Sequence, residues 1–406
     1  MNYIKYIGVD DLDIDLFESQ YVVPEGMSYN SYLIEDEKIA IMDTADRRKG
    51  DEWKANLQAA LAGRQPDYLV AHHMEPDHAA LTCDVLSAYP DLKLVCSAQA
   101  AKMLPNFFDG FPFESRVLTV KEGDTLSLGS HTLHFIAAPM VHWPEVIMSY
   151  EDKEKVLFAA DGFGKFGIVQ TPSNSPVKGE NLAAKSSLPL LKGWGGSWAC
   201  EARRYYFNIC GKYGVQVHSV LRKAAALDIQ AICPLHGPVL TGEAMKEAIR
   251  LYDIWSRYEP ESEGVLVAYA SIHGGTAAAA ERLAELLREK GAPKVVVSDL
   301  SRSDLAEVIE DAFRYPKVVC CAASYDAGVF PPMHDFLYHL QIKNYQKRTF
   351  GIVENGSWAP TAGRVMREMI EAMKDCTIVE PQVTIRSRMK PADEEQLALL
   401  AESILQ

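Results

Sequence analysis

Residues 264–405 alternate strictly between short apolar runs and stretches with helical periodicity, and this alternation constrains the fold more than any other feature of the sequence. Strands that alternate with helices pair in parallel, because each helix carries the chain back to the start of the next strand. The pattern therefore predicts an α/β domain with a five-stranded, doubly wound parallel sheet. The apolar runs are 264–270, 294–300, 317–323, 349–353 and 377–385, and the helical stretches are 276–290, 304–314, 332–341, 361–374 and 391–405.

Residues 1–254 follow a different pattern, in which short strands succeed one another with helices between some of them. Helical periodicity appears at 50–61, 79–88 and 200–227. This mixture predicts mixed sheets with helices outside. The segment 255–263, where Glu-Pro-Glu-Ser-Glu interrupts both patterns, is expected to link a first domain, 1–254, to a second, 264–406. The expected strands of the first domain are 20–23, 30–34, 38–43, 68–71, 93–96, 116–120, 132–138 and 229–233.

A segment rich in metal ligands follows the expected strand at 68–71. Its sequence, Ala-His-His-Met-Glu-Pro-Asp-His (71–78), contains three imidazoles and two carboxylates. The side chains of His73, Glu75, Asp77 and His78 are expected to converge, because the proline ends the regular backbone and directs the following side chains back. A polar turn with solvated side chains is the simpler alternative. Four ligands at this spacing favour the start of a two-metal site.

Four further residues of ligand type, His134, His142, Asp161 and His236, are expected at strand ends of the first domain. The last three follow the apolar runs 137–141, 156–160 and 231–235, and each of these three stands within two residues of a glycine or proline that fixes a turn. Any one of them alone is more often an ordinary surface or core residue. Ligands held at several strand ends, however, are how the edge of a sheet becomes a functional site.

These residues resemble those of the metallo-β-lactamase superfamily and, within it, the flavodiiron proteins, and the resemblance covers the whole chain. The hydrolases of the superfamily carry H-x-H-x-D-H and usually bind zinc, whereas this chain has Glu75 at the second histidine, as in the flavodiiron pattern H-x-E-x-D-H. A carboxylate there adds negative charge and a hard oxygen donor, which favours iron over zinc. The resemblance implies an N-terminal metallo-β-lactamase-like αββα sandwich followed by a flavodoxin-like domain.

The same resemblance implies the role of each ligand. One iron would be held by His73, Glu75 and His142, the other by Asp77, His78 and His236, and Asp161 would bridge them, which makes the diiron centre the reaction site. His72 and His134 match no ligand position, so supporting or structural roles are expected for both. The interval from Asp161 to His236 is longer than the family pattern, with 173–196 as the expected insertion. Proximity to the ligands suggests a pocket lined by Tyr29, Trp143, Phe163, Phe166 and Trp194.

Three loops at expected carboxyl ends of strands in the second domain carry small and hydroxyl-bearing residues. The first, Ser-Ile-His-Gly-Gly-Thr (271–276), precedes a helix, and its free amides would make a phosphate cradle without a lysine. Alone it is as consistent with an ordinary strand–helix turn, but the other two loops each add an aromatic ring that can cover a flavin. They resemble the FMN loops of flavodoxins. The expected FMN-binding residues are Ser271, His273, Gly274, Gly275, Thr276, Ser324, Tyr325, Asp326, Ala327, Gly328, Asn355, Gly356, Ser357, Trp358 and Ala359.

Composition restricts the compartment and the partners. The hydrophobic content of 48% with 24% charged residues is that of a globular protein, and no apolar run is long enough to cross a membrane. The start of the chain is too acidic for a secretory signal, so a cytoplasmic location is expected. The net charge of -14 argues against a nucleic-acid partner. The eight cysteines contain no C-x-x-C pair, which argues against a disulfide framework or a rubredoxin-type iron site.

Two irons and one FMN would together hold the four electrons that reduce O2 to water, whereas reducing two NO molecules to N2O takes two. The chain is therefore expected to be an oxygen and/or nitric oxide reductase, and the sequence leaves that choice open with oxygen favoured. Electrons are expected from rubredoxin or an NADH-dependent reductase. The resemblance also implies a head-to-tail homodimer or a dimer of dimers. The alternative is a metallo-β-lactamase-fold zinc hydrolase fused to a flavodoxin electron-transfer module; a pure electron carrier is disfavoured because no ligand position is lost.

Overall fold

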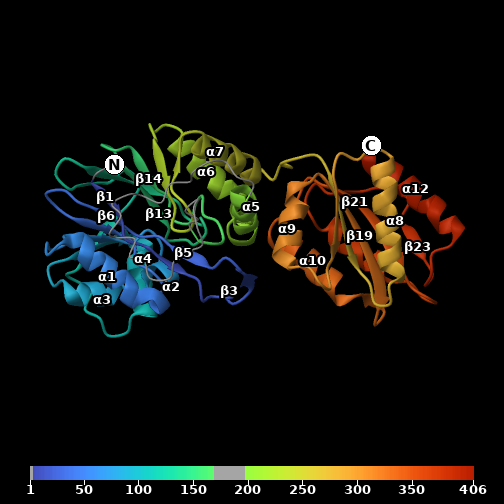
Figure 1. Ribbon diagram of the computed structural model, residues 1–406, viewed down its shortest axis with the longest axis horizontal. Helices are drawn as coiled ribbons and strands as arrows, with labels where there is room; N and C mark the ends of the chain where they lie inside the picture. Colours follow the sequence, from blue (N-terminus) through green and yellow to red (C-terminus); the bar gives the residue numbers. More distant parts are fainter. Residues whose placement is uncertain (1–2, 169–196) are drawn as a thin grey trace. The chain divides into compact units, whose positions relative to one another are not determined.

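The computed structural model describes residues 3–168 and 197–406, so the expected insertion at 173–196, including Trp194, lies outside the described residues. The chain forms two compact units (Figure 1). The first comprises Met1–Tyr206 and Val215–Tyr252, and the second comprises Phe207–Gly214 and Asp253–Gln406. None of the helices in the described parts of the chain is long and apolar enough to cross a membrane.

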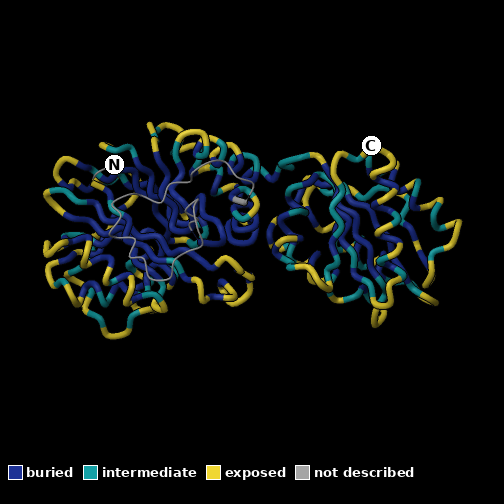
Figure 2. Tube along the Cα trace, in the orientation of Figure 1, coloured by how far each residue is buried: buried dark blue, intermediate teal, exposed yellow. Residues whose placement is uncertain are grey.

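The first unit contains two six-stranded sheets, and buried residues from the strands of both form its core. Figure 2 colours the trace of these strands mainly as buried. This αββα sandwich confirms the fold predicted for the first domain. The first sheet has the order β1 (Ile4–Tyr6), β6 (Tyr32–Ile34), β7 (Ala40–Met42), β8 (Tyr68–Val70), β9 (Lys93–Ser97) and β10 (Val117–Val120). The second has the order β11 (Thr125–Ser127), β12 (Thr132–Ala137), β13 (Ile147–Glu151), β14 (Val156–Phe158), β15 (Ala231–Cys233) and β16 (Leu240–Thr241).

Two short hairpin-like pairs and a set of helices complete the first unit. The pairs are β2 (Val9–Asp11) with β5 (Met27–Tyr29) and β3 (Leu16–Phe17) with β4 (Tyr21–Val22). The helices are η1 (Arg47–Lys49), α1 (Gly50–Leu61), α2 (Pro76–Ala79), α3 (Thr82–Ala88), α4 (Ala98–Phe107), α5 (Ser197–Ile209), α6 (Gly214–Ala224) and α7 (Gly242–Ser256), of which α5 and α7 end in the second unit.

The expected helical stretch 200–227 is in fact two helices. Helix α5 ends at Ile209, a 3₁₀ turn, η3 (Gly211–Tyr213), follows, and α6 begins at Gly214. A Cβ at Gly214 would lie 2.5 Å from the carbonyl oxygen of Ser256, so only glycine allows the backbones to approach this closely. This contact explains the glycine at the start of α6, and the 3₁₀ turn before it contains a second glycine, Gly211.

The second unit contains the predicted doubly wound parallel sheet. Its strand order is β18 (Val295–Asp299), β17 (Val265–Ala270), β19 (Lys317–Tyr325), β21 (Thr349–Asn355) and β22 (Thr377–Ile378), with β23 (Val383–Ile385) also parallel to β21 and β20 (Gly328–Val329) antiparallel to β19. The fifth expected strand is split because Pro381, which lacks an N–H, lies between its two parts. The helices are α8 (Gly275–Glu289), α9 (Leu305–Arg314), α10 (Pro331–Ile342), α11 (Ala362–Glu371) and α12 (Pro391–Leu405).

The segment Phe207–Gly214, which we expected in the first domain, groups with the second unit. The ring of Phe207 stacks on Phe313 of α9 with a centroid distance of 4.2 Å and an interplanar angle of 13°. The side-chain amide of Asn208 donates to the carbonyl of Ala306 at 3.1 Å, and the Lys343 ammonium donates to the carbonyl of Asn208 at 2.8 Å. This end of α5 is therefore part of the packing of the second unit.

Candidate functional site

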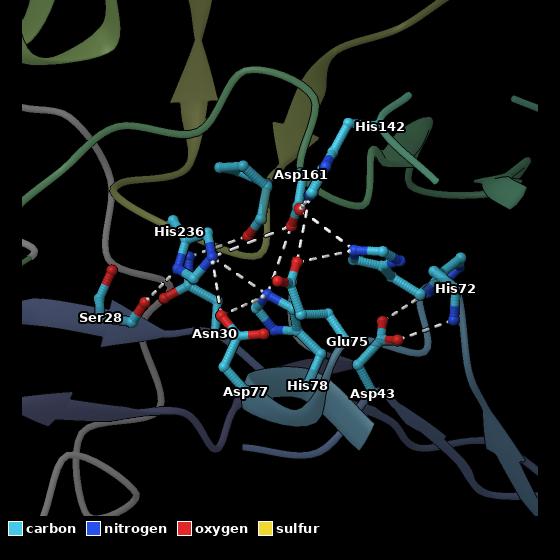
Figure 3. A network of polar contacts seen from close by, with 12 residues as sticks. Ser28, Asn30, Asp43, His72, Glu75, Asp77, His78, His142, Asp161 and His236 are labelled. Atoms are coloured by element: carbon cyan, nitrogen blue, oxygen red, sulfur yellow. Dashed lines mark hydrogen bonds and ion pairs between the residues drawn. The ribbon is translucent and has the colours of Figure 1, made fainter. Parts of the chain in front are cut away.

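All seven residues predicted to be metal ligands lie together where strand ends of the two sheets of the first unit meet (Figure 3). The first sheet contributes four of them after β8, with Asp77 and His78 inside the short helix α2 that begins at Pro76. The second sheet contributes the other three, which follow β12, β14 and β15. The seven are His73, Glu75, Asp77, His78, His142, Asp161 and His236.

The first group of ligands consists of His73, Glu75 and His142. The Nε2 atoms of both histidines lie 3.1 Å from Oε2 of Glu75. The same two nitrogens lie 3.5 Å and 3.2 Å from Oδ2 of Asp161. The two imidazole nitrogens therefore converge on one carboxylate oxygen of Glu75 and on one of Asp161.

The second group consists of Asp77, His78 and His236. Oδ2 of Asp77 lies 3.2 Å from Nε2 of His78 and 3.3 Å from Nε2 of His236, and the two nitrogens are 3.0 Å apart. The other carboxylate oxygen of Asp161, Oδ1, lies 3.3 Å from Nε2 of His78. Asp161 thus stands between the two groups and presents one oxygen to each.

The spacing of these atoms fits two metal ions. Two donors that each lie about 2.1 Å from one ion are about 3 Å apart when they meet it at a right angle, which matches the distances within each group. Both carboxylate oxygens of Asp77 and Oδ1 of Asp161 are buried and accept no hydrogen bond from any described residue. Buried carboxylate oxygens without donors are costly unless a cation compensates them, so the residues present fit a pair of metal ions.

The carboxylates of the site raise the pKa values of the imidazoles. Burial alone lowers the pKa of His78, but the charges of Asp77 and Asp161 outweigh it and raise the pKa to about 10. Burial likewise lowers the pKa of His142, and hydrogen bonds to Asp161 and Glu75 raise it to about 9. Asp161 shows the reverse, because the positive imidazoles hold its pKa well below the usual value despite burial. The metal-free site therefore holds protons that a metal ion would displace.

Asp43 and Thr44, which follow β7, form hydrogen bonds with both ends of the ligand segment, residues 71–78. The Asp43 carboxylate accepts hydrogen bonds from the backbone N–H and from Nδ1 of His72. Thr44 donates through its backbone N–H and its hydroxyl to the carbonyl of His78, at 2.8 Å and 2.6 Å. His72 is not among the ligands. Its Nε2 contacts the hydroxyl of Ser149 on β13 at 2.7 Å, so its ring joins the two sheets beneath the ligand segment.

The loop that carries His236 is held by residues that the sequence did not single out. The Asn30 amide donates to the carbonyls of Pro234 and Gly237 at 2.8 Å and 2.7 Å. Nδ1 of His236 donates to the carbonyl of Ser28 at 2.7 Å. Asn30 lies more than two hundred positions away in the sequence, and only a polar residue just before an apolar strand could have marked it.

Aromatic rings surround the histidines of both groups. Trp143 meets His73 edge-on with a centroid distance of 5.1 Å, and Tyr29 meets His236 at 6.0 Å. Of the other expected pocket residues, Phe163 stacks on Tyr252, and Phe166 packs against Phe17, whose ring contacts His236 at 5.4 Å. Phe17 and Tyr205, whose ring lies 5.5 Å from His236, were missed because their strand and helix lie far from the ligands in sequence. His134 lies outside the cluster and pairs with Asp152 at the surface.

The three predicted flavin loops lie at carboxyl ends of the central strands β17, β19 and β21. Ser271 accepts a hydrogen bond from the N–H of Gly274, which has a φ of 85°, and α8 then begins with no side-chain cap. The amides at this helix start are available to an anion. Asp326 and Ala327 both have a left-handed backbone conformation and form the tight turn between β19 and β20. The Ser324 hydroxyl accepts hydrogen bonds from the backbone N–H groups of Thr361 and Ala362 at the start of α11.

A fourth loop, 386–390, lies against the flavin loops and was not predicted. The side chain of Asn355 and the backbone of Ser387 exchange two hydrogen bonds, of 3.0 Å and 2.9 Å. The hydroxyls of Ser357 and Ser387 are 2.6 Å apart. A Cβ at Gly275 would lie 2.4 Å from the carbonyl oxygen of Ser387, so the first loop and the fourth touch through a glycine. Tyr325 and Trp358 are exposed, Trp358 to 87%. This cradle fits a phosphate and a planar ring.

Comparisons with known proteins agree with this architecture. Residues 27–237, which include all seven ligands, match the model of the ODP family of beta-lactamases. The chain belongs to the ODP beta-lactamase family. This member is similar along 99% of its length to the anaerobic nitric oxide reductase flavorubredoxin of Shigella flexneri, with 26% identity over 80% of that relative.

Solved structures extend the likeness of this ODP family member to both units. It superposes on rubredoxin oxygen:oxidoreductase from Desulfovibrio gigas with a TM-score of 0.86 and 25% identity, covering 100% of this chain and 96% of the other. The flavodiiron protein from Giardia intestinalis gives a TM-score of 0.87 at 23% identity, covering 100% and 94%. The predicted resemblance to flavodiiron proteins is confirmed, as is the predicted fold.

Proposed function

We propose that this protein is a flavodiiron reductase that reduces O2 to water and/or NO to N2O at a non-haem diiron site, with electrons relayed through FMN. The observation that carries the proposal is the arrangement of seven ligands in two groups that share Asp161. Glu75 in the first group supplies a carboxylate where zinc hydrolases of this superfamily have a histidine, which favours iron. The similar proteins named as oxygen and nitric oxide reductases support the same class of reaction.

In this proposal His73, Glu75 and His142 hold one iron, Asp77, His78 and His236 hold the other, and Asp161 bridges them. The irons would bind and reduce the diatomic gas, and FMN would store electrons for them. The histidine rings and carboxylates fix the positions of the two ions before either binds, because Asp43, Thr44 and Asn30 hold the loops that carry them. The aromatic rings of Phe17, Tyr29 and Tyr205 pack around His236 and give this side of the site an apolar lining that would suit a small, uncharged gas.

The flavin would bind in the second unit, with its phosphate at the start of α8 and its ring near Tyr325 and Trp358. Rubredoxin or an NADH-dependent reductase would donate the electrons. The names of two similar proteins contain rubredoxin, which supports the first of these donors. Each iron pair would receive electrons from the FMN of a second copy in a head-to-tail dimer.

Metal and flavin analysis of the purified protein tests this proposal. About two irons and one FMN per chain are expected, together with consumption of O2 or NO in the presence of reduced rubredoxin. Zinc in a protein that hydrolyses esters or thioesters and consumes neither gas would overturn it in favour of a zinc hydrolase carrying a flavodoxin module. The rates of O2 and NO consumption, measured side by side with the same electron donor, would establish which gas is preferred.

A further inference from the structure

Three ligand histidines, His73, His78 and His236, have outer nitrogens, facing away from the cluster, whose surroundings differ between the two groups. In the first group, Nδ1 of His73 lies 2.8 Å from Oε1 of Glu145. In the second group, Nδ1 of His236 donates to a neutral backbone carbonyl, that of Ser28. Nδ1 of His78 is buried and has no hydrogen-bond partner among the residues that the structure describes. A carboxylate therefore stands behind the first group in addition to its ligands.

Glu145 forms hydrogen bonds with two residues of the ligand segment, His73 and Met74. It lies in the loop between β12 and β13, its side chain is completely buried, and the same oxygen that contacts His73 accepts the backbone N–H of Met74 at 2.9 Å. The Ser97 hydroxyl donates to the Glu145 carbonyl and so fixes the backbone of this loop. The other carboxylate oxygen, Oε2, is buried and has no hydrogen-bond partner in the described chain. A buried carboxylate with one unpaired oxygen costs stability, so packing alone does not explain a glutamate here.

The ligands of the two groups are matched in charge. Each has two histidines and one carboxylate of its own, Glu75 or Asp77, and each faces one oxygen of Asp161. A histidine that donates its outer N–H to a carboxylate is held in one tautomer and is a stronger electron donor than one that donates to a carbonyl. Glu145 therefore distinguishes the two groups, because it contacts the outer nitrogen of a ligand, His73, and the histidines of the second group have no such carboxylate among the described contacts.

We propose that Glu145 is a positioning residue that makes the two metal positions unequal, so that a divalent ion binds more tightly at the position of His73, Glu75 and His142 than at the position of Asp77, His78 and His236. This inference rests on the two-metal site of the proposed function. It does not depend on which reaction the site performs, because the asymmetry exists before any gas or electron arrives.

The experiment isolates each position and measures its affinity for Co²⁺ by competition with a chelator. His236→Ala weakens the second position and leaves the first intact, whereas His142→Ala weakens the first and leaves the second intact. Metal-free protein of each background is titrated with and without Glu145→Gln, which keeps the shape and an accepting oxygen but removes the charge. Thermal unfolding of each metal-free variant shows that it is folded.

Glu145→Gln is expected to lower Co²⁺ affinity about 10- to 100-fold in the His236→Ala background and less than about twofold in the His142→Ala background. Glu151→Gln is the matched control, because Glu151 is equally buried but caps the amides of Lys153 and Glu154 and touches no ligand. It should leave both affinities unchanged. Equal losses in both backgrounds, or no loss in either, would overturn the proposal.

A second comparison needs no change at Glu145. With the native glutamate, the His236→Ala protein should bind Co²⁺ more tightly than the His142→Ala protein, and the reverse order would also overturn the inference. The outcome is separable from the proposed function. Equal affinities in a protein that reduces O2 or NO would reject only the role of Glu145, whereas unequal affinities in a protein that reduces neither gas would reject only the reductase.

Discussion

The Asp43 carboxylate holds His72 twice, because Oδ1 accepts its backbone N–H at 2.7 Å and Oδ2 contacts its Nδ1 at 2.5 Å. Both residues are almost fully buried. His72 immediately precedes the first ligand, His73, and its ring reaches Ser149 on the opposite sheet. The shape of the ligand segment therefore depends on a residue that binds no metal.

Replacing Asp43 by Asn should destabilise the metal-free protein by about 3 kcal/mol. The new NH2 group would face one of the two N–H donors of His72 and leave it unsatisfied in a buried position. Chemical denaturation followed by circular dichroism measures the change. Asp152→Asn is the control, because the pair of His134 and Asp152 is exposed and 3.2 Å apart, and it should cost less than about 1 kcal/mol. Similar losses in the two variants would contradict the role assigned to Asp43.

Metal affinity should rise with pH across the neutral range. The pKa values of His142 and His78 in the metal-free site, about 9 and about 10, mean that both carry protons at neutral pH, and a metal ion must displace them. Each displaced proton should raise the apparent affinity about tenfold per pH unit until the pH passes the histidine pKa. Chelator competition at several pH values measures this slope, and proton release can be recorded in weakly buffered solution. An affinity independent of pH would show that the metal-free histidines are already neutral.

Gly275→Ala should release the flavin and spare the metal site. The added methyl group would lie 2.4 Å from the carbonyl oxygen of Ser387 and push apart two of the loops proposed to hold FMN. Overpacking of this kind costs about 1–3 kcal/mol, so FMN affinity should fall about 10- to 100-fold while metal content stays unchanged. Quenching of flavin fluorescence by the flavin-free protein gives the affinity.

Mixed dimers should reveal whether electrons cross between copies. Asp161→Ala removes the residue that contacts both ligand groups, so its metal content and turnover should collapse, whereas Gly275→Ala, assayed at an FMN concentration too low to fill its weakened site, should lack the flavin. In a head-to-tail dimer of one chain of each kind, the intact ligands of one copy face the intact flavin of the other, and about half of the native turnover per dimer should return. Co-expressed mixtures that are dimeric but inactive, although each parent keeps its remaining cofactor, would exclude this arrangement.

Sequence patterns predicted the candidate ligands because these residues stand after strand ends, where a nearby glycine or proline fixes the turn. Helix α12 has the predicted bounds, and so does α1, because their apolar spacing continues up to a terminating residue. The supporting residues gave no such signal. Glu145, Asn30 and Asp43 gain their roles only from folding, which brings each to a ligand segment that is distant in the chain.

The errors in the predicted secondary structure likewise arise where the local sequence carries no signal. The apolar spacing at 200–227 continues past Gly211 and Gly214, so it did not reveal the 3₁₀ turn that separates α5 from α6. Strand β13, between His142 and Asp161, was not predicted because all five of its residues are buried and no alternation marks it. Loop 386–390 has no glycine or ligand motif, and its proximity to Asn355 follows from the parallel pairing of β21 and β23.

The packing of Phe207 against Phe313 limits how this protein can be divided into exchangeable modules. A flavodoxin-like fragment cut at the sequence boundary of 255–263 would lack residues 207–214, and the face of α9 that Phe207 covers would be exposed to solvent. A fragment ending at 254 would carry that apolar segment without its partner. Truncations or gene fusions that separate the two units should therefore aggregate unless residues 207–214 remain attached to the second unit.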